Sequence, residues 1–565
     1  YLVRRLLENT SNESFLRKEY VESQPLSSLL APPSVVSDTA RSKPVDSQDF
    51  RNEPLSDFSL PEVRKAMQQA IETVRSQLGM EWPLPSGFMS GRPRIVSRNP
   101  GRPDEIVGIV QGANTADVEQ AVSQAREKWA AWQQTTAEQR TTILRAAASL
   151  MRERRSVLAA WEVLECGKPW READADVAEA IDFLEFYALE WSRLAVPKRL
   201  GRVPGELNHR VLNPRGVTAV ISPWNFPLAI PTGMVSAALV TGNPVLFKPS
   251  ERSCLMGYWL TEIFREAGVP EGMMAYLPGG PAIGRTIVHH PDVVTVAFTG
   301  SKQVGLSLIQ ETAVTAPGQR MVKRIIAEMG GKNAIIVDET ADLDDAIMGV
   351  VASATGYSGQ KCSACSRVIV HEAIYETFLR RLQEAFSSLR VGNPEDPATQ
   401  VGPVIDARAQ ATILDYVQIG KQEARLLSED RIIQPGWYIC PTLIADVAPT
   451  HRIAREEIFG PVLAVMKAAS FVEALTLANG TDYALTGGVY SRSPANLELA
   501  RQQFDVGNLY LNRPITGALV GRQPFGGHRL SGVGTKAGGE DYLMQFVVTR
   551  IVSEQTLRRG FAPSE

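Results

Sequence analysis

The chain has 565 residues, more than one ordinary domain holds, and its 44% hydrophobic and 21% charged residues are typical of a globular protein. The net charge of −3 gives no electrostatic footprint for nucleic acid or an anionic membrane. No apolar run is long enough to span a bilayer. The five cysteines are few, odd in number and scattered, which favours a reducing compartment, and we expect a cytoplasmic location.

The first 20 residues have the spacing of an amphipathic helix, with Leu2, Leu6 and Leu7 apolar and arginines between them. This start looks like the inside of a helix, and the chain begins with Tyr1 rather than Met, so we expect a fragment of a longer protein. Beyond residue 20, Pro, Ser and Asp become frequent. We therefore expect residues 21–85 to be a linker or N-terminal extension.

From about residue 95 the pattern alternates between helices and strands. The predicted helices cover residues 115–134, 137–165, 172–194, 228–240, 253–266 and 342–354, and a further helix ends at residue 312. The predicted strands cover residues 217–221, 244–247, 293–298, 333–338, 367–370 and 543–552. This alternation predicts an α/β fold with a doubly wound parallel sheet, in which ligands bind at the carboxyl ends of the strands.

Charged and small residues follow these strands. Lys248 and Glu251 come after one strand, and Gly300 and Ser301 after another. Gly279–Gly284 lacks the spacing of a G-x-G-x-x-G motif and does not by itself indicate a dinucleotide site. A carboxylate such as Glu251 can accept hydrogen bonds from both hydroxyls of an adenosine ribose and would repel a 2′-phosphate, which favours NAD over NADP. The alternative is that Lys248 and Glu251 form a solvated rim.

Three polar residues have the types needed for acyl chemistry. Cys362 lies in the turn Gly359–Arg367, which is rich in Gly and Ser and joins a predicted helix to a strand. Asn225 is the centre of Pro223–Pro227, and Glu328 precedes two glycines. The hypothesis is a thiol nucleophile, an oxyanion donor and a base, in that order.

Cys362 and Cys365 also form a C-x-x-C pair, so a redox or zinc site is an alternative. A zinc site needs a second pair of ligands, and the six histidines form no such cluster in the sequence. We expect Cys365 to be a small packed residue. The remaining cysteines, Cys166, Cys254 and Cys440, are expected to be structural.

Six ordered motifs resemble the aldehyde dehydrogenase superfamily over roughly residues 90–550. They are Pro223-Trp-Asn-Phe-Pro227, Phe298-Thr-Gly-Ser301, Glu328-Met-Gly-Gly-Lys332, Gly359-Gln-Lys-Cys362, Glu457-Ile-Phe-Gly-Pro461 and Pro524-Phe-Gly-Gly527. The nucleophile motif looks like the Δ1-pyrroline-5-carboxylate (L-glutamate γ-semialdehyde) dehydrogenase branch. Tyr1–Asn9 is similar to the last helix of a proline dehydrogenase barrel, where the paired arginines (here Arg4 and Arg5) bind proline. Together these likenesses imply the C-terminal part of a bifunctional proline utilisation A enzyme, with a proline dehydrogenase domain as partner.

The resemblance implies an architecture with a Rossmann-type NAD-binding domain, an α/β catalytic domain and a small β oligomerisation element. We expect a barrel remnant over residues 1–20, the NAD-binding domain over 86–327 with an oligomerisation hairpin over about 197–216, and the catalytic domain over 328–530. Residues 531–565 are expected to hold the oligomerisation strand and tail. A free strand edge at 543–552 needs a partner, so a homodimer or larger assembly is expected.

The resemblance also implies the reaction: NAD-dependent oxidation of L-glutamate γ-semialdehyde to L-glutamate through a cysteine thiohemiacetal and thioester, with Cys362, Asn225 and Glu328 as catalytic residues. The cofactor-binding residues are expected to be Ser222, Pro223, Trp224, Lys248, Ser250, Glu251, Gly280, Gly284, Phe298, Gly300, Ser301, Gly330, Glu457 and Phe459. The substrate-binding residues are expected to be Ser363, Gly517, Ala518, Phe226 and Phe525.

Three alternatives remain open. The nearest is an aldehyde dehydrogenase for another small carboxylated aldehyde, such as succinate semialdehyde. A catalytically silent NAD-binding member would lack Cys362 or Glu328, and both are present. A DNA-binding regulator would carry a basic segment, and the sequence shows none of that kind.

Overall fold

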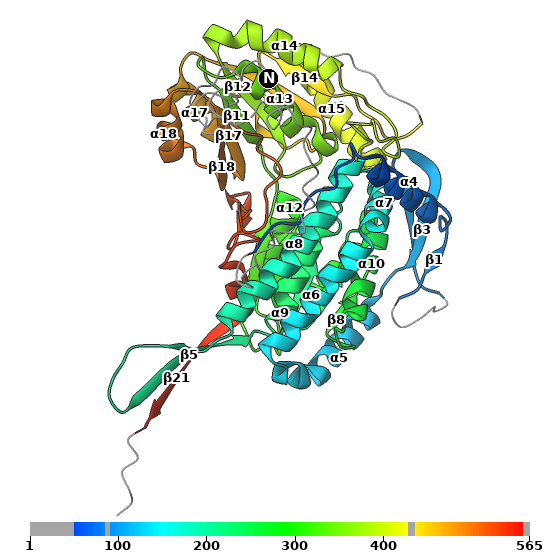
Figure 1. Cartoon of the computed structure of the whole chain (residues 1–565), viewed down its shortest axis with the longest axis vertical. Coiled ribbons are helices and arrows are strands. Elements are labelled where there is room, and N and C mark those ends of the chain that lie inside the picture. The colour runs from blue at the N-terminus through cyan, green and yellow to red at the C-terminus, as the bar shows by residue number, and fades with distance from the viewer. Residues whose placement is uncertain (1–49, 85–90, 428–434, 557–565) are drawn as a thin grey trace, which may run out of the picture. The chain divides into compact units, whose positions relative to one another are not determined.

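The computed structural model describes residues 50–84, 91–427 and 435–556 (Figure 1). The helix predicted for residues 1–20 lies outside the described residues, as does the predicted linker before residue 50. No helix among the described residues is both long enough and apolar enough to cross a membrane.

Within the residues expected to be linker or extension, the chain forms helix α4 (Pro61–Arg75). Its buried residues, Met67, Ala70, Ile71 and Val74, recur at helical spacing and join the largest hydrophobic core. A small sheet follows, in which β3 (Arg102–Gln111) pairs with β1 (Glu81–Trp82) and β2 (Arg94–Asn99).

Four helices then run along the chain: α5 (Thr115–Gln134), α6 (Ala137–Glu153), α7 (Arg155–Cys166) and α8 (Trp170–Leu194). Capping boxes begin α5 and α6, formed by Asn114 with Asp117 and by Thr136 with Gln139. The single helix predicted over 137–165 is wrong, because Arg154 leaves helical geometry at φ −104° and ψ 13°. Apolar residues continue through this break, but α6 buries one face whereas α7 is buried at every residue from Leu158 on.

The first large sheet has the strand order β20-β10-β9-β6-β7-β8. Its parallel strands are β6 (Val217–Ile221), β7 (Val245–Lys248), β8 (Met274–Tyr276), β9 (Val293–Thr299) and β10 (Arg324–Glu328), with β20 (Gly532–Val533) antiparallel at one edge. Helices α9 (Ala229–Val240), α10 (Cys254–Glu266), α11 (Pro281–His289) and α12 (Lys302–Ala313) connect them. Ala219 packs with α5, α11 and α12, whereas its neighbour Val220 packs with α6 to α10, so helices cover both faces.

The second large sheet has the order β13-β14-β15-β12-β11-β17-β18. Its strands are β11 (Asn333–Val337), β12 (Cys365–His371), β13 (Arg425–Leu426), β14 (Thr442–Ala445), β15 (Val462–Ala468), β17 (Thr486–Tyr490) and β18 (Asn508–Leu511). Helices α13 (Leu343–Thr355), α14 (Tyr375–Ser387), α15 (Ala407–Glu423), α16 (Arg452–Arg455), α17 (Phe471–Asn479) and α18 (Pro494–Gln503) accompany them, and β16 (Tyr483–Ala484) pairs with β19 (His528–Arg529). The predicted α/β class with mostly parallel sheets is confirmed.

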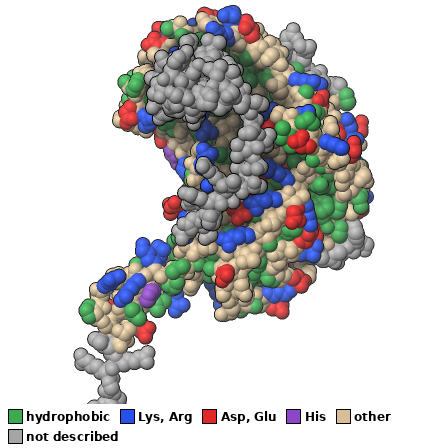
Figure 2. Space-filling model, in the orientation of Figure 1, with side chains coloured by type: hydrophobic (Ala, Val, Ile, Leu, Met, Phe, Trp, Pro, Cys, Tyr) green, Lys and Arg blue, Asp and Glu red, His purple; other side chains and the backbone are tan. Residues whose placement is uncertain are grey.

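A third sheet is formed by β5 (Glu206–Pro214), β4 (Lys198–Arg199) and β21 (Val547–Gln555), and Figure 1 shows β5 and β21 side by side. Lys and Arg side chains gather on its surface in Figure 2, and those of β4 are exposed. The strand predicted over 543–552 begins later than expected. Tyr542–Phe546 is a 3-10 turn, because Tyr542, Leu543 and Phe546 all pack into one core, which strand alternation would not allow.

Candidate active site

The turn before Cys362 holds three consecutive residues in the left-handed region. They are Tyr357 (φ 47°), Ser358 (φ 56°) and Gly359 (φ 68°), at the end of the 3-10 segment Gly356–Gly359. Non-glycine residues with such values are strained, and they persist only where the surroundings fix them. Here the Tyr357 hydroxyl donates to the carbonyl of Cys166 (2.8 Å), and the Ser358 hydroxyl donates to the carbonyl of Gly402 (2.8 Å).

Glycine is required at Gly359 for a second reason: an added Cβ would overlap the carbonyl oxygen of Gly460. The next residue, Gln360, is fully buried. Its side-chain oxygen accepts from the backbone N–H of Ile405 (2.9 Å), and its side-chain nitrogen donates to the carbonyl of Pro403 (3.3 Å). The turn is therefore held by hydrogen bonds to two distant segments.

Asn225 meets this turn from the loop after β6. Its Nδ2 donates to the carbonyl of Gln360 at 3.0 Å, and the side chain is 4% exposed. An amide nitrogen carries two hydrogens, so this bond orients the group and leaves one N–H for a further acceptor. Asn225 and Cys362 both line the same cavity. The geometry fits the role of oxyanion donor that the sequence predicts.

Cys362 lines this cavity, and the side chain of Asn333 fixes its backbone. Asn333 donates to the carbonyls of Cys362 (2.7 Å) and Ala364 (2.9 Å). Burial, together with the charges of Glu328 and Glu457, raises the pKa of the Cys362 thiol to about 12. The thiol is therefore protonated at neutral pH in this state and needs a proton acceptor before it can attack a carbonyl.

Glu328 is the last residue of β10 and its carboxylate is buried. Burial raises its pKa to about 8, while a hydrogen bond from the backbone of Gly527 and the charge of Lys536 oppose that rise. The side chain faces Gly526, where an added Cβ would lie 2.8 Å from Oε1. Its Oε2 atom has no hydrogen-bond partner among the described residues. Glu328 does not line the cavity beside Cys362, so acting on a group bound there requires a rotation of its side chain.

The cavity beside Cys362 has a volume of about 940 Å³ and extends along the carboxyl ends of β6, β7 and β9. These strands are neighbours in the sheet, which is why residues far apart in the sequence meet here. The predicted residues that line it are Ser222, Pro223, Trp224, Asn225, Lys248, Ser250, Glu251, Gly284, Phe298, Gly300, Ser301, Gly330, Cys362, Glu457 and Phe459. Gly280 lies just outside this lining, facing both carboxylate oxygens of Glu251 at 3.4 Å from an added Cβ.

Several features of this cavity suit a dinucleotide. Gly280 and Ser301 are the N-caps of α11 and α12, and helix N-termini attract phosphate. Gly284 lies beside the aliphatic chain of Lys248, whose pKa is lowered by burial. The carboxylate of Glu251 stands at the end of β7, where it can accept hydrogen bonds from ribose hydroxyls.

Glu457 also lines this cavity. Its Oε1 accepts from the backbone N–H of Gly331 at 3.0 Å. An added Cβ at Gly330 would overlap the same carboxylate, so the glycine pair allows this approach. Phe459 has a left-handed φ of 58° and packs edge-on against Trp224, with ring centroids 5.7 Å apart.

Comparison with known proteins identifies the family. The sequence profile of the aldehyde dehydrogenase family matches residues 88–552. The chain belongs to the aldehyde dehydrogenase family. The 1-pyrroline-5-carboxylate dehydrogenase of Geobacillus kaustophilus is 48% identical over 511 residues, which cover 90% of this chain and 99% of that protein.

Two solved structures extend this likeness. A Thermus 1-pyrroline-5-carboxylate dehydrogenase with bound NAD is 46% identical, with a TM-score of 0.88 over 90% of this chain and 99% of that one. Proline utilization A (PutA) from Bdellovibrio bacteriovorus is 46% identical with a TM-score of 0.94 over 100% of this chain. The chain spans 59% of the length of that PutA structure.

The residues that this aldehyde dehydrogenase was expected to use for its substrate do not line the large cavity. Ser363 directly follows Cys362, and its carbonyl accepts from the Thr486 hydroxyl (3.2 Å). Gly517 (φ 74°) is exposed, and Ala518 is half-buried beside it. The ring of Phe226 lies 4.7 Å from the Nζ of Lys168, and Phe525 pairs through its backbone with Ala537. Their role in substrate binding stays a prediction.

Acidic residues of α8 are the main feature that sequence reasoning missed in this aldehyde dehydrogenase. Glu172 forms an ion pair with Lys361, the neighbour of Cys362, at 2.6 Å. Asp176 pairs with buried Lys168 (2.9 Å), and burial raises the pKa of Glu179 to about 8. The spacing of Glu172, Asp176 and Glu179 (i, i+4, i+7) places them on one helix face. That spacing is visible in the predicted helix and could have identified them.

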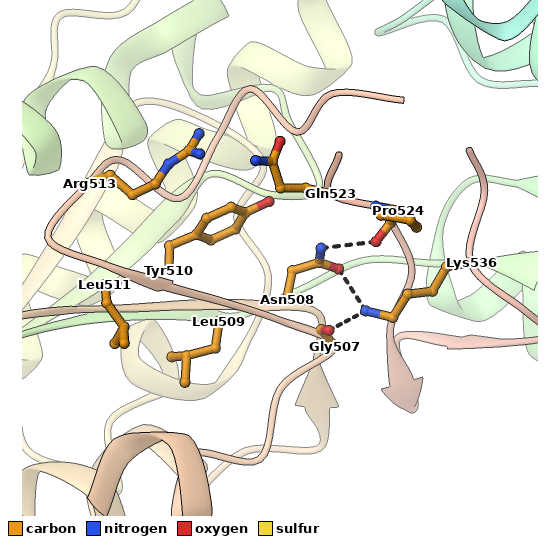
Figure 3. Close-up of a pocket in the computed structure, with 9 residues that line it drawn as sticks. All are labelled: Gly507, Asn508, Leu509, Tyr510, Leu511, Arg513, Gln523, Pro524 and Lys536. Atoms are coloured by element: carbon orange, nitrogen blue, oxygen red, sulfur yellow. Dashed lines mark hydrogen bonds between the residues drawn. The ribbon is translucent and has the colours of Figure 1, made fainter. Parts of the chain in front are cut away.

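A second cavity, of about 440 Å³, lies along β18 (Figure 3). Lys536 donates to the carbonyl of Gly507 and to Oδ1 of Asn508 (3.0 Å), and Asn508 donates to the carbonyl of Pro524 (3.0 Å). These bonds tie the beginning of β18 to the segment around Gly526 and Gly527 that faces Glu328. None of the predicted site residues lines this cavity.

Proposed function

We propose that this aldehyde dehydrogenase oxidises L-glutamate γ-semialdehyde, the open form of Δ1-pyrroline-5-carboxylate, to L-glutamate with NAD. The observation that carries the proposal is the meeting of Cys362 and Asn225 at one end of a cavity whose other end has dinucleotide features. Relatives that match nearly their whole length are named 1-pyrroline-5-carboxylate dehydrogenase, which supports the choice of substrate.

The reaction begins when the Cys362 sulfur attacks the aldehyde carbon, giving a thiohemiacetal. The carbonyl oxygen becomes an oxyanion, which accepts from the second N–H of Asn225 and from the backbone N–H of Cys362. Donors placed before charge develops stabilise it strongly, and removal of one typically costs roughly 3 kcal/mol. The thiol proton leaves to water before the sulfur attacks, because the thiolate is the nucleophile.

Bound NAD supplies the acceptor for the hydride that leaves the tetrahedral carbon. The carbon is then a thioester on Cys362, which water must hydrolyse. Glu328 takes the proton of that water as the C–S bond breaks, releasing glutamate and the thiol. Its buried, unpartnered oxygen and raised pKa suit a base that works near neutral pH.

NAD, rather than NADP, is the proposed cofactor because Glu251 stands where the adenosine ribose is expected, and its charge repels a 2′-phosphate. Lys248 and the N-termini of α11 and α12 would hold the ribose and pyrophosphate, and Glu457 and Phe459 the nicotinamide end. Tighter binding of NADP than of NAD in a titration would refute this assignment.

The carboxylate of the substrate is proposed to bind the backbone N–H groups of Gly517 and Ala518 and the Ser363 hydroxyl, with Phe226 and Phe525 against its aliphatic chain. The alternative is another small carboxylated aldehyde, such as succinate semialdehyde. Steady-state kcat/KM for both aldehydes decides between them. A higher value for succinate semialdehyde would overturn the substrate assignment.

We also propose that the chain works together with a proline dehydrogenase, as the likeness to PutA suggests. Pyrroline-5-carboxylate made from proline would then be the source of the semialdehyde. Coupled assays with an added proline dehydrogenase should give NADH from proline. No NADH in that mixture, while added pyrroline-5-carboxylate is oxidised, would contradict the partnership.

A homodimer or larger assembly in the cytoplasm completes the proposal. The strand β21 is an edge strand, and its Val548, Ile551 and Val552 are exposed, so its outer edge can pair with a second copy. Cys166, Cys254, Cys362 and Cys365 are free thiols, which suits a reducing compartment. A monomer mass in sedimentation or light scattering would contradict the assembly.

A further inference from the structure

The first described residues, Phe50–Phe58, form a strap across helix α8. Asn52 Nδ2 donates to Oδ2 of Asp182 (2.8 Å), and the backbone N–H of Glu53 donates to Oδ1 (2.6 Å). Ser56 donates to both oxygens of Asp174 through its backbone N–H (2.8 Å) and hydroxyl (2.6 Å). Asp174 and Asp182 are each only 3% exposed, and they lie two turns apart on one helix face. Two buried carboxylates therefore fix the strap.

The strap also contacts a segment about 470 residues later, residues 515–521, which we call the substrate loop. The second hydrogen of Asn52 Nδ2 goes to the carbonyl of Val520 at 2.9 Å. The ring of Phe50 packs edge-on against Phe186, with centroids 5.1 Å apart. An added Cβ at Gly521 would lie 3.1 Å from both rings, so this glycine lies directly against the pair. One amide and one ring thus join α8 to the end of the substrate loop.

The substrate loop is anchored at both ends and at Leu519, whose N–H donates to the side-chain oxygen of Gln523 at 3.1 Å. Among the described residues, no hydrogen bond holds Thr516, Gly517 or Ala518. At the first end, the N–H of Ile515 donates to the Ser353 hydroxyl at 3.1 Å. At the other end, the N–H of Gly521 donates to the carbonyl of Gly538 at 2.9 Å. Between them, Gly517 has a φ of 74°, and nothing lies within 4 Å of an added Cβ. The positions of the Gly517 and Ala518 N–H groups therefore depend on the anchored residues on either side, Ile515 before them and Leu519–Gly521 after them.

We propose that the strap, through Asn52 and Phe50, is a specificity-positioning element that holds the Val520–Gly521 end of the substrate loop in the place needed to receive a substrate carboxylate. The inference rests on the proposed function, in which the Gly517 and Ala518 N–H groups bind that carboxylate. Asn52 is a positioning residue, because it acts on the substrate only through Val520. Substrate binding would then require residues of the strap, which precede the NAD-binding sheet in the chain.

The test compares wild type, Asn52→Ala and Phe50→Ala with Ser56→Ala as a matched control, all in the full chain. Ser56 lies on the same strap but binds Asp174, and it has no hydrogen bond to the substrate loop among the described residues. Asn52→Ala should raise KM for glutamate semialdehyde about tenfold, the loss of one hydrogen bond's positioning, with kcat changed less than about threefold. KM for NAD and for propanal, which has no carboxylate, should stay at the wild-type values. Phe50→Ala should act in the same direction and Ser56→Ala should not.

Thermal unfolding of each variant identifies any that fail to fold, and Asn52→Gln, which can keep one of the two bonds, should be milder than Asn52→Ala. Unchanged KM for the semialdehyde in both folded variants overturns the inference, as does an equal rise with propanal. If wild type does not prefer the carboxylated aldehyde over propanal, the proposed function fails, and the strap has no carboxylate site to position. If the wild type prefers the carboxylated aldehyde and both variants keep that preference, the inference about the strap fails while the proposed function stands.

Discussion

The turn that carries Cys362 and the strand end that carries Glu328 are held very differently. Tyr357, Ser358 and Gln360 are buried, and each of their side chains hydrogen-bonds to a distant carbonyl or N–H. Glu328 receives one backbone hydrogen bond, from Gly527, and has an oxygen with no partner among the described residues. Small residues, Gly526 and Gly532, surround its carboxylate.

This difference matches what each residue must do in the proposed reaction. The nucleophile and its oxyanion donor need a fixed geometry, and strain in the turn is tolerated only because many contacts impose it. The base must reach a water at the thioester from a position outside the cavity lining, so it needs freedom to rotate. The many hydrogen bonds of the Cys362 turn keep it in one geometry, whereas the few contacts of the Glu328 carboxylate leave it room to move.

The largest effect is expected for Cys362→Ala. Removing the nucleophile should lower turnover of pyrroline-5-carboxylate by ~10⁴-fold or more, because no other group forms the thioester. NADH formation measures it. Cys365→Ala is the matched control from the same C-x-x-C pair. Cys365 is the first residue of β12 and is buried in the core, so activity should stay within a few-fold. Activity of Cys362→Ala above the background rate would contradict the assignment.

Asn225→Ala should cause the next largest loss of activity. It removes a donor of the proposed oxyanion site, so kcat should fall about 10²–10³-fold, roughly 3 kcal/mol of transition-state stabilisation. Steady-state kinetics measure the loss in kcat, and an NAD titration measures cofactor affinity, which is expected to stay unchanged. A loss of less than tenfold would show that the Cys362 backbone N–H alone suffices.

The pH profile of kcat tests the role of Glu328, the less tightly held of the two residues. Burial raises the pKa of Glu328 to about 8, so below that pH its carboxyl is protonated and cannot accept a proton from water. With hydrolysis limiting, kcat should fall about tenfold for each pH unit below 8 and level off above it. In Glu328→Gln this limb should disappear. A flat wild-type profile between pH 6 and 8 would contradict the role of Glu328 as base.

The smallest catalytic effect is expected for Gln360→Leu, which keeps the bulk of the side chain but leaves the N–H of Ile405 and the carbonyl of Pro403 unpaired. Each buried unpaired group costs about 1–3 kcal/mol, so the thermal transition should move down clearly. Activity at low temperature should fall by about tenfold or less. Unchanged thermal stability would show that the turn does not depend on these bonds.

Much of this molecule was predictable from its sequence, because its signals are local. The ordered motifs give the family, which is confirmed. The buried β-branched runs give part of both large sheets, namely β6, β7, β9, β11 and β12. Lys248, Glu251 and Gly300 could be placed together because the carboxyl ends of neighbouring parallel strands share one edge. Most of the predicted cofactor residues do line one cavity.

What the sequence did not show are contacts that depend on distant partners. The pairing of Glu172 with Lys361 joins residues 189 positions apart, and Asn52 meets Val520 across 468. The helix break at Arg154 leaves the spacing of apolar residues unchanged, so the sequence pattern does not reveal it. The turn at Tyr542–Phe546 forms because its side chains pack into a core built mostly from distant segments. Such features follow from tertiary packing, which overrides local propensity.

In the proposed reaction, Cys362 forms a thioester and Glu328 activates the water that removes it. The most direct test mixes Glu328→Gln with NAD and pyrroline-5-carboxylate, counts NADH per chain, and maps the adduct by mass spectrometry. About one NADH per chain is expected, followed by arrest, with a glutamyl group on Cys362. Continued turnover without an adduct, or an adduct on another residue, would contradict it.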